Sequence, residues 1–158
     1  IDKVREHIRS NFEYENVKQT LLESGVLYVN EYLFASEHGM DLQLDGNIDI
    51  EHIMPQSGIN REHIMHDIGV NDQDEFREYA EKLGNKILLE SEINRGIGDA
   101  WFRTKKENHI TKGNGYIGSK FPIAKSLVTY AKDTWTKEDI DLATEKAAKR
   151  IANFVFEL

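Results

Sequence analysis

The tetrapeptide EHIM occurs twice in the chain, and its first copy places a carboxylate, Glu51, beside an imidazole, His52. Neutral imidazole has a reference pKa of about 6.5 and can take the proton that water loses as it attacks phosphorus. The phosphate and the departing oxygen need a hard cation, which carboxylate and amide oxygens bind well. Asn94 supplies such an amide downstream. We therefore interpret His52 as a general base, and Glu51 and Asn94 as metal ligands, for phosphodiester hydrolysis.

The second copy, Glu62 with His63, lies in a polar and acidic stretch. His63 and His66 are three residues apart, so on a helix they would share one face and could bind zinc. No third ligand follows at a recognisable spacing, and neither copy has the second histidine of the HExxH protease pattern. We interpret His63 and His66 as surface residues.

The elements that must position His52 can be predicted from local patterns. Apolar residues at spacings of three and four predict helix within the first 40 residues. The run LQLDGNIDI predicts a β-hairpin that turns at residues 45–47, and Pro55 ends the second strand just after His52. NKILLE predicts another strand. SEINRGIG indicates a loop, and a helix should follow from about Asp99 to His109.

Further helices should surround these strands. One is expected from about Asp72 to Lys82, closed by Gly84, and another over residues 121–132. The last helix should begin near Thr136, because TKED has the pattern of a capping box. Its apolar stripe indicates a packing surface and comprises Ile140, Ala143, Ala147, Ile151 and Phe154.

Composition narrows the classes of function. The net charge is −8, but residues 95–125 carry +5, with seven Lys or Arg against two Asp or Glu, whereas residues 1–94 carry −12. The basic segment could face phosphate or could be a solvated surface. The absence of cysteine excludes disulfides and thiolate-bound metals. No apolar run reaches the roughly 18 to 20 residues that a membrane helix needs.

Three segments together resemble a known family. IDIEHIMPQS, LGNKILLESEINRG and WFRTKK are similar to the HNH motif of the ββα-metal, or His-Me finger, nucleases. The likeness is greatest to the C-terminal nuclease domain of GmrSD-type modification-dependent restriction endonucleases, and the motif also resembles the HNH domain of RNA-guided CRISPR nucleases. The motif spans about residues 48–106. The helical flanks with TWTKEDI extend the resemblance over most of the chain.

The resemblance implies a role for each matching position. His52 would be the general base, Glu51 a metal ligand where many relatives have Asp, and Asn94 the second ligand. Asn85 would hold the loop that carries the base. The implied ion is Mg²⁺, or else Mn²⁺.

The resemblance also implies basic contacts to DNA. Lys105 or Lys106 matches a lysine that is expected on the helix, for phosphate contact or for stabilising charge in the transition state. Arg95, Arg103 and Lys106 are the candidate DNA-binding residues. Which of the two lysines acts stays open at this point.

The fold class implied is α+β, a mostly helical domain around a small ββα-metal core. Residues 1–158 would form one domain, with a helical flank over 1–40, the core over about 42–110 and a helical C-terminal part over 120–158. The chain begins at Ile1 and shows no secretory leader, so we expect it to be the C-terminal part of a larger protein.

The expected function is that of a metal-dependent DNA endonuclease or nickase in a bacterial restriction or anti-phage defence protein of the cytoplasm. Its expected partners are DNA and an N-terminal NTPase or sensor domain, on the same chain or on a partner chain, which would recognise the DNA modification. The alternative is a catalytically weak helical module that binds DNA or packs against a partner domain. Nicking and double-strand cleavage are both compatible with the sequence.

Overall fold

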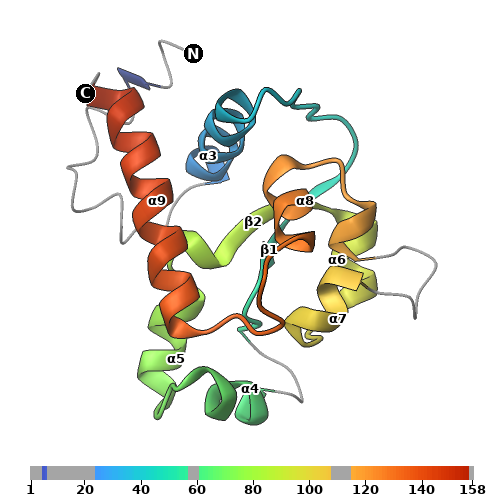
Figure 1. Ribbon diagram of the computed structural model, residues 1–158, viewed down its shortest axis with the longest axis vertical. Helices are drawn as coiled ribbons and strands as arrows, with labels where there is room; N and C mark the ends of the chain where they lie inside the picture. Colours follow the sequence, from blue (N-terminus) through green and yellow to red (C-terminus); the bar gives the residue numbers. More distant parts are fainter. Residues whose placement is uncertain (1–4, 7–23, 57–60, 108–114, 157–158) are drawn as a thin grey trace.

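The computed structural model describes residues 5–6, 24–56, 61–107 and 115–156 of the chain. The fold class is α+β, as the sequence predicted, with many helices around a two-stranded antiparallel sheet (Figure 1). The elements in chain order are α3 (Ser24–Glu37), β1 (Ile48–His52), α4 (Arg61–Ile68), α5 (Gln73–Ala80), the 3-10 turn η1 (Leu83–Asn85), β2 (Lys86–Glu90), α6 (Ser91–Ile97), α7 (Phe102–Glu107), the 3-10 turn η2 (Tyr116–Gly118), α8 (Pro122–Val128) and α9 (Lys137–Phe156).

The sheet carries the candidate base His52 and its neighbours in the sequence. β1 and β2 run antiparallel, with Ile48 opposite Glu90 and His52 opposite Lys86. Because side chains alternate along a strand, those of Asp49 and Glu51 lie on one face and that of His52 lies on the other. The predicted positions of His52 at a strand end and of NKILLE in a strand are confirmed.

The predicted hairpin is wrong. Residues 42–44 form no strand, and β1 pairs with β2 from much later in the chain. The Asp45-Gly46-Asn47 segment still turns the chain, since Gly46 has a φ of +80°, a left-handed conformation that glycine adopts without steric cost. The turn chemistry was therefore predicted correctly, while the strand partner was not.

The predicted loop over SEINRGIG is also wrong, because this segment forms helix α6, which packs against both strands. Ile93 and Ile97, four residues apart, are both buried, and this apolar pair outweighs the weak helix propensity of Asn94 and Gly96. Gly98, with a φ of +50°, ends the helix. Asn94 therefore lies on a helix that directly follows β2.

Helix α5 begins as predicted, with the Asp72 side chain accepting a hydrogen bond from the Glu75 amide. Gly84 has a different role from the helix stop that was predicted. A Cβ atom at Gly84 would lie 2.4 Å from the backbone nitrogen of Thr144 and 2.6 Å from the carbonyl oxygen of Ile140. Only glycine therefore lets η1 pack directly on α9.

The remaining helices largely follow the sequence predictions. α3 confirms helix within the first 40 residues, while residues 7–23 lie outside the described part of the chain. α7 begins at Phe102 rather than near Asp99, and its expected end at His109 lies outside the described residues; α8 is shorter than expected. α9 follows Thr136, whose amide donates to the Asp139 carboxylate at 2.8 Å, one half of the predicted capping box. Helix α4 was not predicted.

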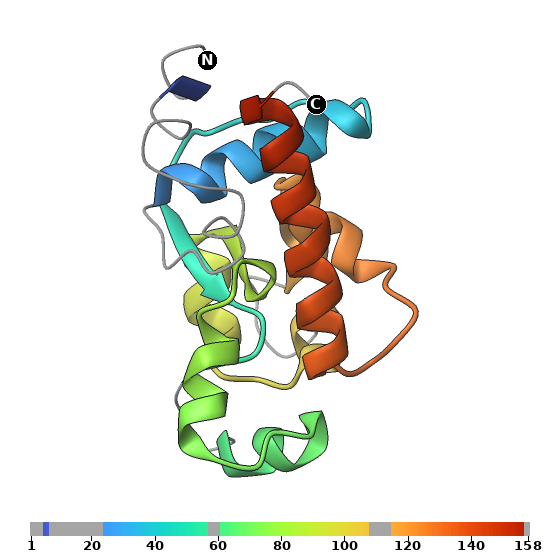
Figure 2. The same cartoon turned by 90° about the vertical axis from the view of Figure 1, so that its left-hand side faces the viewer.

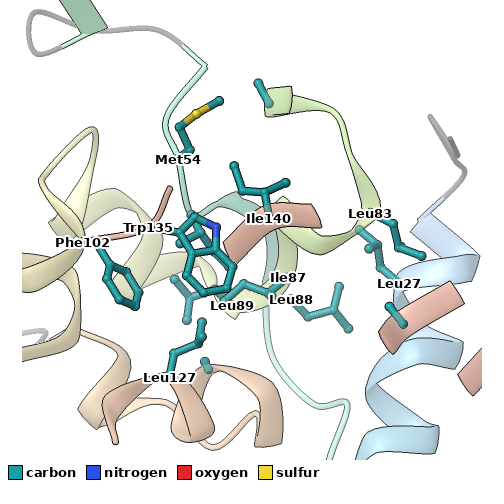
Figure 3. Close-up of a cluster of buried hydrophobic side chains, with 14 of the residues drawn as sticks. Leu27, Met54, Leu83, Ile87, Leu88, Leu89, Phe102, Leu127, Trp135 and Ile140 are labelled. Carbon is teal, nitrogen blue, oxygen red and sulfur yellow. The ribbon is translucent and has the colours of Figure 1, made fainter. Parts of the chain in front are cut away.

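The core forms around β2, and Figure 3 shows Ile87, Leu88 and Leu89 at its centre. All three are at most 3% exposed. Burying each such side chain contributes about 1.5–3 kcal/mol relative to leaving it exposed, so β2 is firmly held. α6 contacts both strands, and α3 and α8 contact β2. The predicted stripe of α9 is confirmed as core, with Ile140 and Ile151 fully buried.

Figure 2 shows α9 running along most of the length of the molecule, with α3 crossing its C-terminal end and α4 and α5 at the opposite end. His52 is therefore at the end of β1 that points toward α4 and α5. Among the described residues, no helix combines the length and apolar character needed to cross a membrane.

Candidate active site

His52 is held by a carboxylate that sequence reasoning missed. Its Nε2 atom lies 3.1 Å from Oε1 of Glu81, the residue that follows α5. Lys86, opposite His52 in the sheet, lies 3.6 Å from the other oxygen of Glu81. Burial lowers the pKa of His52, although Glu81 opposes this, so the imidazole is neutral at neutral pH. The fixed ring can present Nδ1 as a proton acceptor.

Asn85 fixes the segment that follows His52. Its side-chain oxygen accepts a hydrogen bond from the Met54 amide at 2.7 Å. Its side-chain nitrogen donates to the carbonyl oxygens of Met54 and Ala80, each at 3.0 Å. The residue is fully buried, so these hydrogen bonds satisfy polar atoms that water cannot reach. Asn85 thus links the segment after β1 to the end of α5, and Glu81 is the next residue after that helix.

Glu51 lies in a buried polar cluster with Lys105 and Tyr116. Lys105 Nζ is 3.0 Å from Glu51 Oε2, and the Tyr116 hydroxyl donates to the same oxygen at 2.8 Å. All three residues are at most 3% exposed. Burial raises the pKa of Glu51, and Lys105 and Tyr116 oppose that rise. The Glu51 carboxylate is therefore occupied by its contacts with Lys105 and Tyr116.

Lys105 also reaches the backbone beside the candidate base. Its Nζ donates to the carbonyl oxygens of His52 at 2.8 Å and Ile53 at 3.2 Å. The side chain is fully buried, which fits neither the phosphate contact that the resemblance implied nor a solvated charge. Its position in the structure makes it an anchor for the end of β1.

Lys106 is buried as well. Its Nζ donates to the carbonyl oxygens of Tyr130 and Lys132, each at 2.9 Å. At 4% exposure it does not fit the expected contact with DNA. By contrast, Arg95 on α6 and Arg103 on α7 are exposed, as a DNA contact requires.

The two predicted metal ligands bond to different protein groups. The Asn94 amide donates to Oδ2 of Asp49 at 3.1 Å, while Glu51 faces Lys105. Ser91 donates from Oγ to Oδ1 of the same Asp49 carboxylate at 2.8 Å. The part of the chain that the structure describes contains no group of three or more His, Cys, Asp or Glu side chains placed to hold a metal ion. The assignment of Glu51 and Asn94 as metal ligands therefore stays a prediction, and both side chains are engaged with protein groups in this structure.

Asp49 is a further residue beside Asn94 that sequence reasoning did not single out. A signal was available, because strand alternation places Asp49 on the same face as Glu51. Asp49 and Asn94 line an open pocket of about 420 Å³, together with Tyr28, Ile48, Ile50 and Leu88. Their oxygen atoms are the kind that Mg²⁺ and Mn²⁺ bind.

The second EHIM copy lies on α4, away from these residues. Glu62, His63 and His66 are all exposed. His66 Nδ1 lies 3.5 Å from the carboxylate of its neighbour Asp67, also at the surface. This placement agrees with their interpretation as surface residues.

The fold and site together define an α+β domain in which a helix follows directly on a strand pair and a buried polar network braces a histidine at a strand end. Comparison with protein families identifies the family of the chain. It belongs to the family described as GmrSD restriction endonucleases, C-terminal domain, whose model matches residues 2–150. Searches of curated proteins and of solved structures found no match. The family is a restriction-endonuclease family, and that implies DNA as the class of substrate.

Proposed function

We propose that this chain is a metal-dependent DNA endonuclease or nickase domain of the HNH type, acting in bacterial restriction or anti-phage defence. The observation that carries the proposal is the setting of His52. A neutral imidazole stands at the end of β1, held through Nε2 by Glu81 at 3.1 Å. The family supplies the class of enzyme and of substrate.

The proposed mechanism assigns proton transfer to His52. Nδ1 takes the proton from the water that attacks phosphorus, because Nε2–H is engaged with Glu81. The Glu81 carboxylate also stabilises the imidazolium that forms, since opposite charges at this distance favour the protonated ring. Asn85 and Lys105 hold the backbone on either side of the base. Mg²⁺ or Mn²⁺ is the proposed cofactor and, when bound, neutralises charge on the phosphate and the departing oxygen.

The substrate would approach the free edge of β1. Within the described residues, β1 has β2 as its only strand neighbour. A phosphodiester along the other edge could be reached from both faces of the strand, from His52 on one and from Asp49 and Asn94 on the other. Arg95 and Arg103 are the proposed DNA contacts, because both are exposed on the helices that follow β2.

Recognition of modified DNA is assigned to a partner. An N-terminal NTPase or sensor domain, on the same chain or a partner chain, would select the substrate in the bacterial cytoplasm. The net charge of −12 on residues 1–94 would repel DNA, which suits a nuclease domain that needs a second domain for binding.

The test is a plasmid-nicking assay with Mg²⁺, Mn²⁺ and EDTA on modified and unmodified plasmid. His52→Ala should lower the rate by about 10²–10⁴-fold, the usual contribution of a general base. Thermal unfolding and DNA affinity are measured beside the rate, because the His52 side chain is only 17% exposed and bonds to Glu81, so the variant must be shown to keep its fold. Undiminished nicking by His52→Ala would contradict its role as the base.

The ion pair between Glu51 and Lys105 favours a second candidate, a catalytically weak module that binds DNA or packs against its partner domain. This pair removes one of the two metal ligands that the family resemblance implied. Under this candidate the wild-type chain would show no metal-dependent nicking, and His52→Ala would behave like the wild type.

A further inference from the structure

We infer that the pocket between α3, α8 and α9 binds a nucleotide, with the phosphate at Lys146 and Arg150 and the base beside Tyr130 and Trp135. The inference goes beyond the proposed function, which uses neither this pocket nor these four residues. The chemistry that the pocket would recognise is a planar aromatic ring joined to a phosphate, either in a free nucleotide or in a strand of DNA.

The pocket has a volume of about 290 Å³ and lies over β2, with α3, α8 and α9 as its walls (Figure 1). Much of its lining is apolar, including Ile87 from β2 and Ile123 and Leu127 from α8. Its size is close to the lower end of the range of about 300–1,000 Å³ that small-molecule sites occupy. An apolar lining of this kind favours an aromatic ring over a fully hydrated ligand.

Helix α9 gives the pocket a direction, because one face of the helix forms a wall. That face comprises Asp139, Leu142, Ala143, Lys146, Ala147 and Arg150. A carboxylate thus lies at one end and two cations lie toward the other. From Asp139 to Lys146 the helix rises about 10 Å, at 1.5 Å per residue, which is close to the length of a nucleoside monophosphate. The carboxylate would repel a phosphate and so direct it to the cationic end.

The cationic end contains an ammonium that is available to a phosphate. Lys146 is exposed, and within the described residues it has no hydrogen-bond or ion-pair partner. Arg150 follows one turn later and is fixed by Asn30 Oδ1 at 2.7 Å and by Glu37 Oε2 at 3.2 Å. Its guanidinium also lies 5.2 Å from the centroid of the Phe34 ring. A fixed guanidinium beside a mobile ammonium suits an anion with several oxygen atoms.

The aromatic end consists of Tyr130 and Trp135, whose ring centroids lie 5.3 Å apart. Trp135 also lies 5.4 Å from the ring centroid of Phe102, as Figure 3 shows from the core side. The Tyr130 hydroxyl donates to Asp139, which fixes the tyrosine ring. Aromatic and apolar side chains bind a base by its flat face, which every base possesses. We therefore expect little preference among the bases.

The pocket adjoins the candidate base. Ile53 directly follows His52, Lys86 lies opposite His52 in the sheet, and both line the pocket. A nucleotide bound here would therefore lie beside the end of β1, where a strand of DNA would pass under the proposed function. The test must include both a free nucleotide and a DNA strand for this reason.

The test measures nucleotide binding in EDTA, without cleavage. The sequence has two tryptophans, so Trp101→Phe leaves Trp135 as the only one, and its fluorescence then reports on the pocket that it lines. This parent chain is titrated separately with dAMP, with single-stranded oligo(dT) and with inorganic phosphate. We expect saturable quenching by dAMP or by oligo(dT), and much weaker binding of inorganic phosphate, which lacks the aromatic ring.

Variants in the same parent chain locate the binding. Lys146→Ala should weaken it at least about tenfold, because a charge-assisted hydrogen bond to the phosphate is lost. Lys149→Ala is the matched control, because Lys149 is an exposed lysine on α9 outside the pocket, and it should bind like the parent. Ala143→Phe and Ser126→Phe fill the pocket from opposite walls and should abolish saturable quenching. Ser126 is exposed, so Ser126→Phe should keep the fold, which thermal unfolding checks.

Each outcome decides the inference. Binding of dAMP that depends on Lys146 supports a free nucleotide as the source, and the same dependence with oligo(dT) alone supports a DNA strand. Absence of saturable binding, equal losses in the two lysine variants, binding that survives Ser126→Phe, or inorganic phosphate binding as tightly as dAMP would overturn the inference. The nuclease proposal is tested separately. A chain that binds the nucleotide but nicks no DNA would refute the proposed function alone, and a chain that nicks DNA without such binding would refute only this inference.

Discussion

Replacing Lys105 with methionine should be among the most damaging single changes in this chain. The side chain is fully buried and makes three polar contacts, an ion pair with Glu51 at 3.0 Å and hydrogen bonds to the carbonyl oxygens of His52 and Ile53. Methionine has a similar length and fills the space, so the change tests charge and hydrogen bonding rather than volume.

The expected cost follows from the contacts. Removing one partner of a buried ion pair typically costs about 3–5 kcal/mol, because the remaining charge is left unpaired. The two carbonyl groups lose their donor, which adds roughly 1 kcal/mol each. Since a domain is stabilised by about 5–15 kcal/mol in total, Lys105→Met should unfold a large fraction of the protein at moderate denaturant. Glu51→Gln in the same chain removes the stranded charge and should recover about half of the loss.

Urea denaturation followed by tryptophan fluorescence measures the free energy of unfolding, because buried Trp135 reports on the core. The wild type, both single variants and the double variant complete a double-mutant cycle. A cost below about 1 kcal/mol for Lys105→Met, or a double variant less stable than Lys105→Met alone, would refute the argument that the pair is a coupled anchor.

Three other predictions concern separate parts of the molecule. Glu81→Ala should lower kcat by about tenfold or more with little change in KM, and nitrogen NMR of His52 should show loss of the Nε2–H tautomer; an unchanged tautomer would exclude the positioning role. Gly84→Ala should lower the unfolding free energy by roughly 1–3 kcal/mol or more, since the new Cβ would meet the Thr144 backbone at 2.4 Å, and an unchanged Tm would contradict this close packing. Burial raises the pKa of Glu31 to about 8, so its contribution to stability should be lost as pH rises from about 4.5 through 8, by on the order of a few kcal/mol. Glu31→Gln should flatten that pH dependence in urea titrations.

Some elements could be predicted because their signals are local. The TKED segment encodes its own helix start, since Asp139 reaches back to the Thr136 amide within one turn. NKILLE contains the continuous apolar run Ile87, Leu88 and Leu89, which a strand buried on both faces requires. The position of His52 at a strand end followed from Pro55, which cannot continue a ladder.

Other elements depend on distant contacts. β1 was expected to pair with residues 42–44, but its partner β2 follows more than thirty positions later, and no local pattern encodes that choice. In the sequence, Asn94 and Gly96 indicated a loop. In the structure, Ile93 and Ile97 are buried and their helix packs on the sheet. Such packing is a tertiary effect that overrides helix propensity.

The candidate site likewise combines features that could be predicted from the sequence with features that depend on the fold. The chemical types of His52, Asn85 and Asn94 could be recognised in the sequence. The carboxylate that holds His52 could not, because Glu81 lies in a stretch rich in acidic residues and only the fold selects it. The lysines of WFRTKK were expected to contact phosphate or to stabilise charge in the transition state, but both are buried. Their burial depends on Glu51 and on backbone carbonyl groups that the rest of the chain brings to them.

The most direct test of the central claim compares two matched histidine variants in one single-turnover nicking assay with Mg²⁺. His52 and His63 occupy the same position in identical tetrapeptides, so His52→Ala and His63→Ala differ only in structural setting. We expect His52→Ala to lose about 10²–10⁴-fold in rate and His63→Ala to cut DNA like the wild type. Equal rates for the two variants would contradict the account of His52 as the base.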